Sequence, residues 1–452
     1  MRWGQVIDRG KLKSALAKES DRFIEEHPKS NEQYRKSRQH LLGGVPMAWM
    51  KRWPGAFPIF ARSATGAQIT DIDGHQYVDF ALGDTGAMTG HAPAYLAEAI
   101  VEQSRIAITT MMPSEDSIEA AKALTERFGL DKWQFALSAT DANRFALRLA
   151  RFVTRRKQIL VFDWCYHGTV DETLVTLDDS GRVIPRLGNS TSAFDPAQTT
   201  KVVQFNDLPA LEEALRTEDV AAVLCEPALT NIGIVLPDDG FHEKLRELCT
   251  KYGTLLIIDE THTICVGPGG YGRQYDLKPD MLTIGKPIGG GIPSAAFGMT
   301  DGVAIQLEEM MNEDSIDVSG IGGTLGANAF SLRATLATLN NSLSKEHFDV
   351  SIPLAKDWAD GVRRVINSYN LDWSVQNLGS RSEYWFCPAP KNGREAAQAM
   401  DPELERYFHL YALNRSILLT PFHNMALFSH YHSSADVERH TEVFKETVES
   451  IL

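Results

Sequence analysis

Between about residues 115 and 290, short apolar runs alternate with amphipathic helical segments. Runs such as QILVFD and TLLIIDE are rich in Val, Ile and Leu without polar alternation, which is typical of strands covered on both faces. The segments between them, such as DANRFALRLARFV, carry apolar residues at helical spacing. This alternation predicts βαβ units and a mainly parallel sheet in an α/β fold.

The regions on either side have different patterns. Residues 11–27 read as an amphipathic helix, and QITDIDGHQYVDF predicts a hairpin that turns at Asp73-Gly74. After residue 330, a long helix leads into one helix over 355–369, two strand-like pieces and a final helix. We therefore predict a large domain over 71–330 and a smaller α+β domain over 331–452. The N-terminal helix and segment over 1–70 are expected to join the small domain.

Composition excludes several classes of protein. With 45 basic and 59 acidic residues among 452, the net charge is −14, which disfavours non-specific nucleic-acid binding. No run of 18 apolar residues occurs and no apolar segment opens the chain, so neither a membrane span nor a secretory signal is expected. The five cysteines are widely spaced without a CxxC pair, which indicates a reducing compartment. These features predict a cytoplasmic protein without membrane or nucleic-acid partners.

Polar residues follow several of the predicted strands, where ligands bind in open α/β sheets. Ser138-Ala139-Thr140-Asp141 stands directly before a helix, and its free N–H groups suit a phosphate. The same residues also make an ordinary helix cap. Tyr166 and His167 follow QILVFD, where an aromatic ring stacks on a flat heterocycle or simply packs.

The most specific candidates are an acid and a lysine at two strand ends. Asp259 ends TLLIID, and a buried acid there needs a cation, such as a protonated ring nitrogen, or hydrogen-bond donors. A salt bridge and a metal site shared with His262 are the alternatives. Lys286 ends MLTIGK, where a desolvated amine becomes nucleophilic and forms a Schiff base, unless it extends to the surface.

Two other motifs do not indicate a binding site. The segment 267–272 fits GxGxxG, but no periodic helix opens there and no acid follows at the required distance. The C-terminal histidines lack the ligand spacing of a metalloprotease, so we expect them to lie at the surface or to pack against neighbouring side chains. They are His423, His430, His432 and His440. We predict no metal site.

The ordered set of motifs resembles the class III aminotransferases, which are pyridoxal-phosphate (PLP) enzymes of fold type I, on the branch that includes glutamate-1-semialdehyde aminomutase. The resemblance covers about residues 40–450 and depends on these segments: LLGGV, DIDGHQYVDF, GAMTGHAP, SATDANRFALRLAR, CYHG, EPALTNIG, LLIIDETHT, GKPIGGGIPSAAFG and IGGTLGANAF. It implies a seven-stranded, mainly parallel sheet in the large domain, a smaller domain, and a homodimer with shared active sites.

The resemblance also implies residue roles. Lys286 forms the Schiff base and moves a proton, and Asp259 pairs with the pyridine nitrogen. Thr324 reaches the phosphate of the neighbouring subunit. The remaining cofactor-binding positions include phosphate ligands at the helix start, ring-stacking residues and neighbours of the 3-hydroxyl: Ser138, Ala139, Thr140, Tyr166, His167, Glu226, Asn231, Thr261 and His262.

The chain departs from the family where the substrate is expected. The N-terminal arginine pattern of the aminomutases appears here only as GGVPMAWMKRW. Trp49 and Trp53 suggest an apolar side of the pocket, and Lys51 or Arg52 could hold a carboxylate. Arg381, in GSRSEYWF, is a second carboxylate candidate.

These features predict a transaminase that moves an amino group from an amine or amino acid to a keto acid or carbonyl acceptor such as pyruvate. The alternatives are an aminomutase or lyase with the same cofactor and a non-catalytic binding protein of the same fold. A metal-dependent hydrolase built on Asp259, Glu260 and His262 is a further alternative.

Overall fold

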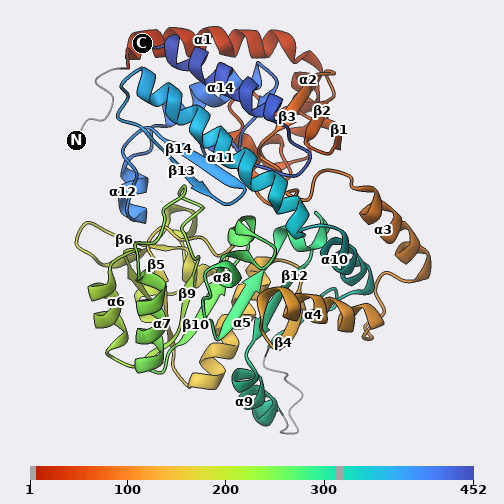
Figure 1. Cartoon of the computed structure of the whole chain (residues 1–452), viewed down its shortest axis with the longest axis vertical. Helices are drawn as coiled ribbons and strands as arrows, with labels where there is room; N and C mark the ends of the chain where they lie inside the picture. Colours follow the sequence, from red (N-terminus) through yellow and green to blue (C-terminus); the bar gives the residue numbers. More distant parts are fainter. Residues whose placement is uncertain (1–6, 312–319) are drawn as a thin grey trace. The chain divides into compact units, whose positions relative to one another are not determined.

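The computed structural model describes residues 7–311 and 320–452 and consists of two compact units (Figure 1). Unit 1 comprises Met1–Pro93, of which the structure describes residue 7 onward, together with Glu346–Ala389 and Ala399–Leu452. Unit 2 comprises Ala94–Lys345 and Pro390–Gln398. Within the described residues, no helix combines the length and the apolar character that crossing a membrane requires.

Unit 2 is built on a seven-stranded sheet in the order β4-β12-β11-β10-β9-β5-β8. The pairs among β11, β10, β9, β5 and β8 are parallel, and β12 is antiparallel to both of its neighbours. This confirms the mainly parallel sheet. Its strands are β4 (Lys132–Ala136), β5 (Gln158–Phe162), β8 (Thr200–Val203), β9 (Val220–Cys225), β10 (Leu255–Asp259), β11 (Met281–Ile284) and β12 (Ala295–Met299). A separate hairpin pairs β6 (Val175–Leu177) with β7 (Val183–Pro185).

The helices of unit 2 follow from the sequence pattern. In α5 (Ala139–Thr154), buried Ala142, Phe145 and Leu149 recur at helical spacing, and the Ser138 side chain caps the first turn by accepting from Asp141 N. Figure 1 shows α6 and α7 side by side near β9 and β10. The other helices of this unit are α3 (Ala94–Ile106), α4 (Glu115–Phe128), α6 (Leu208–Leu215), α7 (Phe241–Lys251), α8 (Gly270–Gln274), α9 (Asp301–Met311), α10 (Ala329–Asn341) and α12 (Gly393–Gln398).

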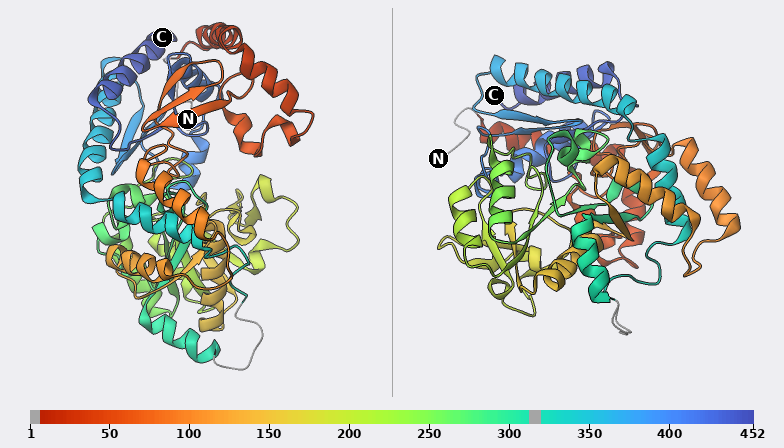
Figure 2. Two further views of the ribbon diagram at one scale, coloured as in Figure 1. Left: turned by 90° about the vertical axis from the view of Figure 1, so that its right-hand side faces the viewer. Right: turned by 60° about the horizontal axis from the view of Figure 1, so that its bottom comes forward.

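Unit 1 contains two smaller sheets. One has the order β1-β2-β3-β15 and includes the hairpin predicted at Asp73-Gly74, and the other is the antiparallel sheet β13-β14-β16. Figure 2 shows α11 and α14 along the same side of β13 and β14. The elements are α1 (Arg9–Glu26), α2 (Pro28–Ser37), β1 (Ala61–Thr65), β2 (Gln68–Asp71), β3 (Gln76–Asp79), α11 (Lys345–Ser368), β13 (Ser374–Leu378), β14 (Arg381–Trp385), α13 (Pro402–Leu413), β15 (Ile417–Leu418), β16 (Met425–Leu427) and α14 (Ser434–Glu449).

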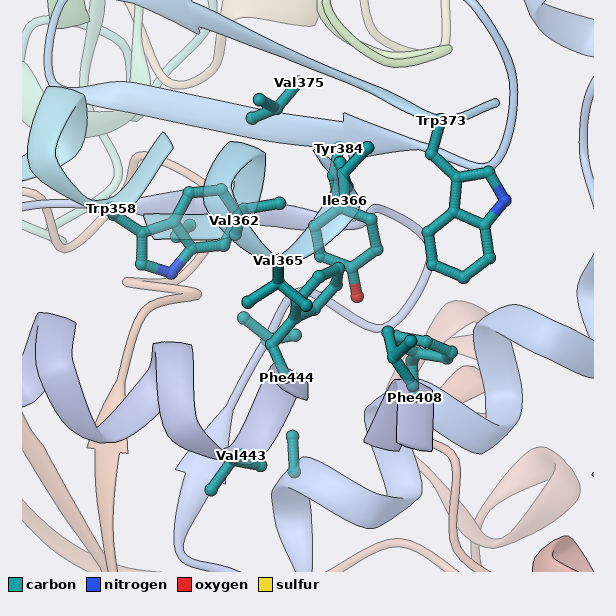
Figure 3. Close-up of a cluster of buried hydrophobic side chains, with 14 of the residues drawn as sticks. Trp358, Val362, Val365, Ile366, Trp373, Val375, Tyr384, Phe408, Val443 and Phe444 are labelled. Atoms are coloured by element: carbon teal, nitrogen blue, oxygen red, sulfur yellow. The ribbon is translucent and has the colours of Figure 1, made fainter. Parts of the chain in front are cut away.

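An aromatic cluster forms the core of unit 1 (Figure 3). Trp358 of α11, Tyr384 of β14 and Phe444 of α14 are all buried, and the rings of Tyr384 and Phe444 have centroids 4.9 Å apart. Large rings of this kind bury much apolar area per residue, which compensates for the short strands of this sheet.

The structure differs from the sequence analysis in unit 1. The region after residue 345 was predicted to hold one helix before the final one, but it also contains α13 and the short α12, which belongs to unit 2. The strand predicted in ILLTPF is only the two-residue β15. The packing units also divide the chain differently from the predicted domains, because residues 71–93 belong to unit 1 and 331–345 to unit 2. The domain boundaries themselves stay predictions. The five cysteines are buried, and none of them forms a disulfide within the described residues.

Candidate active site

The strands β4, β5, β9, β10 and β11 run in one direction, so the residues that follow them meet at the same edge of the sheet. This edge carries Ser138, the segment at Tyr166, Glu226, Asp259 and Lys286. The sheet therefore brings together residues that lie far apart in the sequence.

The carboxylate of Asp259 is buried among hydrogen-bond donors. Its Oδ2 accepts from Asn143 Nδ2 at 2.8 Å and from His167 Nδ1 at 2.9 Å, and its Oδ1 accepts from Thr261 N at 3.0 Å. Burial alone favours the neutral acid, but the hydrogen bonds, led by that from His167, lower the pKa of Asp259 to about 2. Asp259 is therefore a fixed anion at the strand end. His167 is its cationic partner, because nearby Cys165 and Asp259 outweigh burial and raise the pKa of His167 to about 10.

Lys286 begins the short 3-10 helix η7 (Lys286–Gly289) directly after β11. Its φ of 48° is left-handed, which costs a non-glycine residue about 1–3 kcal/mol and is common at functional sites. Its half-buried Nζ contacts His262 Nε2. The backbone strain and this contact fix the direction of the amine.

A chain of hydrogen bonds continues from His262. The hydroxyl of Thr230 donates to Glu226 Oε2 at 2.6 Å, so Thr230 Oγ1 accepts from His262 Nδ1 at 2.6 Å. With Nδ1 protonated, the lone pair of His262 Nε2 faces Lys286 Nζ. Glu226 Oε1 accepts from Tyr166 N at 3.0 Å, and burial raises the pKa of Glu226.

The first turn of α5 lies against two glycine positions. A Cβ at Gly168, whose φ is 77°, would come within 2.1 Å of Thr140 Oγ1, and a Cβ at Gly285 would come within 3.0 Å of Ala139 N. Thr169 N donates to Thr140 Oγ1 at 3.1 Å. Glycine is therefore required for the close approach of these loops to Ala139 and Thr140, whose N–H groups lack acceptors within the helix.

The remaining predicted cofactor residues differ in position. Thr261 is buried, and its Oγ1 has no hydrogen-bond partner in the described part of the chain. Tyr166 and Asn231 are half-buried. Thr324 lies apart from the strand ends, in an exposed turn before α10, where it lines a cavity of about 760 Å³ with Thr110 and other residues.

The structure disfavours the metal-dependent alternative. Glu260 Oε2 accepts from Thr263 Oγ1 and Tyr271 N, its Oε1 accepts from Gly272 N, and burial raises the pKa of Glu260 to about 7. The GxGxxG-like segment thus supplies the amides that bind Glu260, through the short helix α8 that the sequence analysis did not predict. Asp259, Glu260 and His262 face different partners and do not form a common ligand set among the described residues.

The substrate candidates all lie in unit 1. Trp49 and Arg52 are exposed, and Arg52 borders a cavity of about 440 Å³ that Glu405 also lines. Arg381 is fully buried; its Nη2 donates to Thr85 Oγ1 at 2.6 Å and lies 3.5 Å from Asp84 Oδ1. Its Nε and Nη1 have no hydrogen-bond partner within residues 7–311 and 320–452.

The C-terminal histidines serve local packing rather than one site. His423 pairs with Glu383, His432 contacts the Asp79 carbonyl, and His440 packs on Trp358. His430 stacks on the ring of His347.

Sequence reasoning missed three residues of the site. Asn143 accepts from Thr283 Oγ1 at 2.6 Å while it donates to Asp259 and to the His167 carbonyl, and Thr230 joins His262 to Glu226. Asn143 is a buried polar residue on the apolar face of α5. A polar residue at such a position in the helical pattern is the signal that could have found it.

The family model for class-III aminotransferases matches residues 49–357. The chain belongs to the class-III aminotransferase family. Glutamate-1-semialdehyde 2,1-aminomutases from Sulfurihydrogenibium azorense and Desulfitobacterium hafniense are 31% and 33% identical to it. These matches cover 92% and 94% of the chain, and 98% of each relative.

Solved structures of this class-III family agree with the fold. A glutamate-1-semialdehyde aminomutase from Pseudomonas aeruginosa PAO1 shares 45% identity over 99% of the chain and 100% of its own, with a TM-score of 0.97, and a K286A variant was solved in complex with PMP. An omega-transaminase from Sphaerobacter thermophilus shares 26% identity over 93% of the chain and 97% of its own, with a TM-score of 0.84. The chain is a fold type I enzyme whose cofactor is pyridoxal 5'-phosphate.

Proposed function

We propose that this class-III enzyme is an aminomutase, which exchanges amino and oxo groups between neighbouring carbons of a substrate of the glutamate-1-semialdehyde type. The sequence analysis favoured transamination to a separate acceptor, and the relatives support the alternative. The observation that carries amino-group chemistry is the buried Asp259 anion, held by three donors at the edge of the sheet where Lys286 emerges.

The residues at this edge fit the cofactor. Asp259 would hold the protonated ring nitrogen, because a fixed carboxylate favours the charged form of a neighbouring base. The N–H groups of Ala139 and Thr140, with the Ser138 hydroxyl, would hold the phosphate. The unpaired hydroxyl of Thr261 would face the ring. The other proposed contacts are Tyr166 against a ring face, His167 behind Asp259, and Asn231, Glu226 and His262 toward the 3-hydroxyl.

The bound cofactor supplies an electron sink that stabilises negative charge on a substrate carbon. The protein moves the proton. Lys286 Nζ takes a proton from one substrate carbon and returns it to another atom, and its contact with His262 fixes the direction of its lone pair. The path through Thr230 to Glu226 holds His262 in the tautomer that accepts from Lys286.

Arg381 is the proposed ligand of the substrate carboxylate. Burying a guanidinium with two unpaired nitrogens is unfavourable, and a carboxylate satisfies both donors in a bidentate pair. Arg52 is exposed and has no comparable deficit. Arg52 and Trp49 stay predicted substrate residues.

The test is product formation from a single substrate. Purified enzyme loaded with pyridoxal phosphate or its amino form should convert glutamate-1-semialdehyde, without any second amino donor or acceptor, to the isomer with its amine and oxo groups exchanged. Chromatography with mass-matched standards would detect this isomer. Lys286→Ala protein is the control. Absence of the isomer, together with amino transfer to pyruvate, would reject the aminomutase proposal in favour of transamination.

Transamination remains a second candidate because of one feature. The segment GGVPMAWMKRW departs from the aminomutase pattern, and it includes the exposed Trp49, whose ring lies 6.1 Å from that of Phe422. An aromatic pair suits an apolar amine better than a small dicarboxylate-derived substrate. A panel of amines with pyruvate as acceptor tests this candidate.

We further propose a homodimer with shared active sites, in which Thr324 serves the partner's phosphate. Its exposure in one chain and the exposed apolar side chains of Met111 and Met112 in the same cavity wall support this. A cytoplasmic location is proposed too, and it is supported by the lack of a disulfide among the cysteines of the described residues.

A further inference from the structure

A cluster of histidine and acid side chains lies in unit 1, where the junction of α1 and α2 meets the β2–β3 hairpin (Figures 1 and 2). His27 follows α1, Asp71 ends β2, and His75 lies in the turn. One ligand atom of each lies within 4.8 Å of the other two. His27 and Asp71 are buried, and the side chain of His75 is 36% exposed, so the cluster opens to solvent on one side.

The possible ligand atoms of these three residues are separated by distances similar to those between the ligands of a bound metal ion. Asp71 Oδ2 lies 3.7 Å from His27 Nε2 and 3.1 Å from His75 Nδ1. Two ligands of a tetrahedral zinc ion at about 2.0–2.1 Å from the metal lie roughly 3.3 Å apart. Both separations from Asp71 Oδ2 are therefore within about half an ångström of this spacing, and the two ring nitrogens lie within 4.8 Å of each other.

Each buried ligand is oriented by a second hydrogen bond. His27 Nδ1 donates to the Phe23 carbonyl at 2.7 Å, which leaves the Nε2 lone pair directed at the cluster. Asp71 Oδ1 accepts from Gly74 N at 2.7 Å and His75 N at 2.9 Å, which leaves Oδ2 for the cluster. Ligand imidazoles and carboxylates of metal sites are held in this way.

The Tyr77 hydroxyl contacts both buried ligand atoms, at 2.9 Å from His27 Nε2 and 2.8 Å from Asp71 Oδ2. It has a single proton for these two acceptors, and His75 Nδ1, which lies 3.1 Å from Asp71 Oδ2, supplies a second donor only in the tautomer that carries its proton on Nδ1. In the other tautomer, three acceptor atoms face one hydroxyl proton, and a cation among them satisfies all three.

We propose that His27, Asp71 and His75 bind a divalent transition-metal ion of the zinc type, with a water molecule from the solvent side as the fourth ligand. Two imidazole nitrogens and one carboxylate oxygen suit Zn²⁺ rather than Mg²⁺ or Ca²⁺. The ion joins the α1–α2 junction to the β2–β3 hairpin, which Asp73 already connects through its bonds to Lys29 N and Ser30 N. Its role is structural, and it is independent of the amino-transfer site.

The experiment uses the full-length, cofactor-loaded protein after removal of metals by a chelator. Titration with ZnCl₂ in a calorimeter should show one saturable site per chain, and saturating Zn²⁺ should raise Tm by about 3 °C. His75→Ala removes the partly exposed ligand without opening the core, and it should weaken the affinity by at least about 100-fold and abolish the shift in Tm. Anomalous diffraction at the zinc edge should place the ion between His27 and Asp71.

His40→Ala is the matched control, because His40 is an exposed histidine of the same unit outside the cluster. It should bind Zn²⁺ as the wild type does, which separates this site from surface histidines and from the cofactor. His27→Gln tests the buried ligand independently. If the wild type has no saturable site, or if His75→Ala retains it, the proposal is overturned and the cluster is a hydrogen-bonded network around Tyr77.

Discussion

In unit 2 the buried carboxylate of Asp259 receives hydrogen bonds from Asn143, His167 and Thr261, whereas in unit 1 the buried guanidinium of Arg381 leaves two of its nitrogens without a partner among the described residues. Both side chains carry a charge that burial disfavours. The Asp259 carboxylate is surrounded by donors, one of them the cationic His167, whereas two nitrogens of the Arg381 guanidinium lack acceptors. This difference agrees with the proposed roles, in which Asp259 holds the resident cofactor and Arg381 binds the substrate carboxylate.

The backbone around each site agrees with this difference. Lys286 has a left-handed φ of 48°, and Asp84 and Thr85, the partners of Arg381, have φ of 49° and 86°. Such conformations are unfavourable for these residue types and persist where the surrounding structure requires them. Substitutions in the two units should therefore affect different steps of the reaction.

The largest effect is expected from Lys286→Ala, which removes the amine that moves the proton. We expect a loss of about 10⁴-fold or more in turnover, measured with the best substrate found. The visible absorbance of the lysine-bound cofactor should disappear as well. Lys278→Ala, an exposed lysine paired with Asp276, is the matched control and should keep full activity. A Lys286→Ala enzyme within tenfold of the wild type would refute the assignment of the active site.

Asp259→Asn should reduce turnover by roughly 10³-fold. The amide keeps the size of the side chain but no longer stabilises a protonated ring nitrogen, so the cofactor becomes a weaker electron sink. The phosphate cradle at Ala139 and Thr140 is untouched, and the variant should still retain cofactor after gel filtration. Stopped-flow measurement of a single half-reaction separates the two effects. Loss of cofactor with an unchanged rate at saturating cofactor would instead make Asp259 a binding residue alone.

Much of unit 2 could be predicted from the sequence, because its central strands are apolar runs and functional residues stand at or just after the ends of several of them. Asp259 and Lys286 were found in this way, and the parallel sheet then explains why they meet. The partners of Asn143 and Thr230 could not be predicted, because tertiary packing rather than local spacing sets them, although the polar Asn143 on the apolar face of α5 was a signal. Unit 1 was less predictable, since β15 has two residues and α13 follows a loop without a clear periodic signal.

Arg381→Ala should act on substrate binding and spare the chemistry. Losing a charge-assisted pair worth about 1.5–3 kcal/mol should raise KM for a carboxylate substrate by roughly 10- to 150-fold, with little change for an uncharged amine. Because the side chain is fully buried, its truncation leaves a cavity and should also lower Tm by a few degrees. Arg363→Ala, a half-exposed arginine of α11, is the control. A marked fall in Tm with an unchanged KM would make Arg381 a structural residue.

Asn143→Ala should have the smallest effect, because it weakens the Asp259 network without removing the anion. The change leaves the Thr283 hydroxyl without its acceptor and should lower the free energy of unfolding by about 1–3 kcal/mol, with a roughly tenfold fall in turnover.

Since the pKa of Asp259 is about 2, below its usual value near 4, its charge stabilises the folded state above about pH 4, and this contribution is lost as the pH falls toward 2. Asn143→Ala removes one donor that lowers this pKa. The gap between the unfolding free energies of the wild type and the variant, measured in urea, should therefore be constant from pH 7 to about pH 4 and should narrow below pH 4. Asn341→Ala, which removes an exposed asparagine bonded to one helix carbonyl, should show no such gap. A gap that widened on acidification would mean that Asn143 stabilises the neutral acid, and that the Asp259 site is not built around an anion.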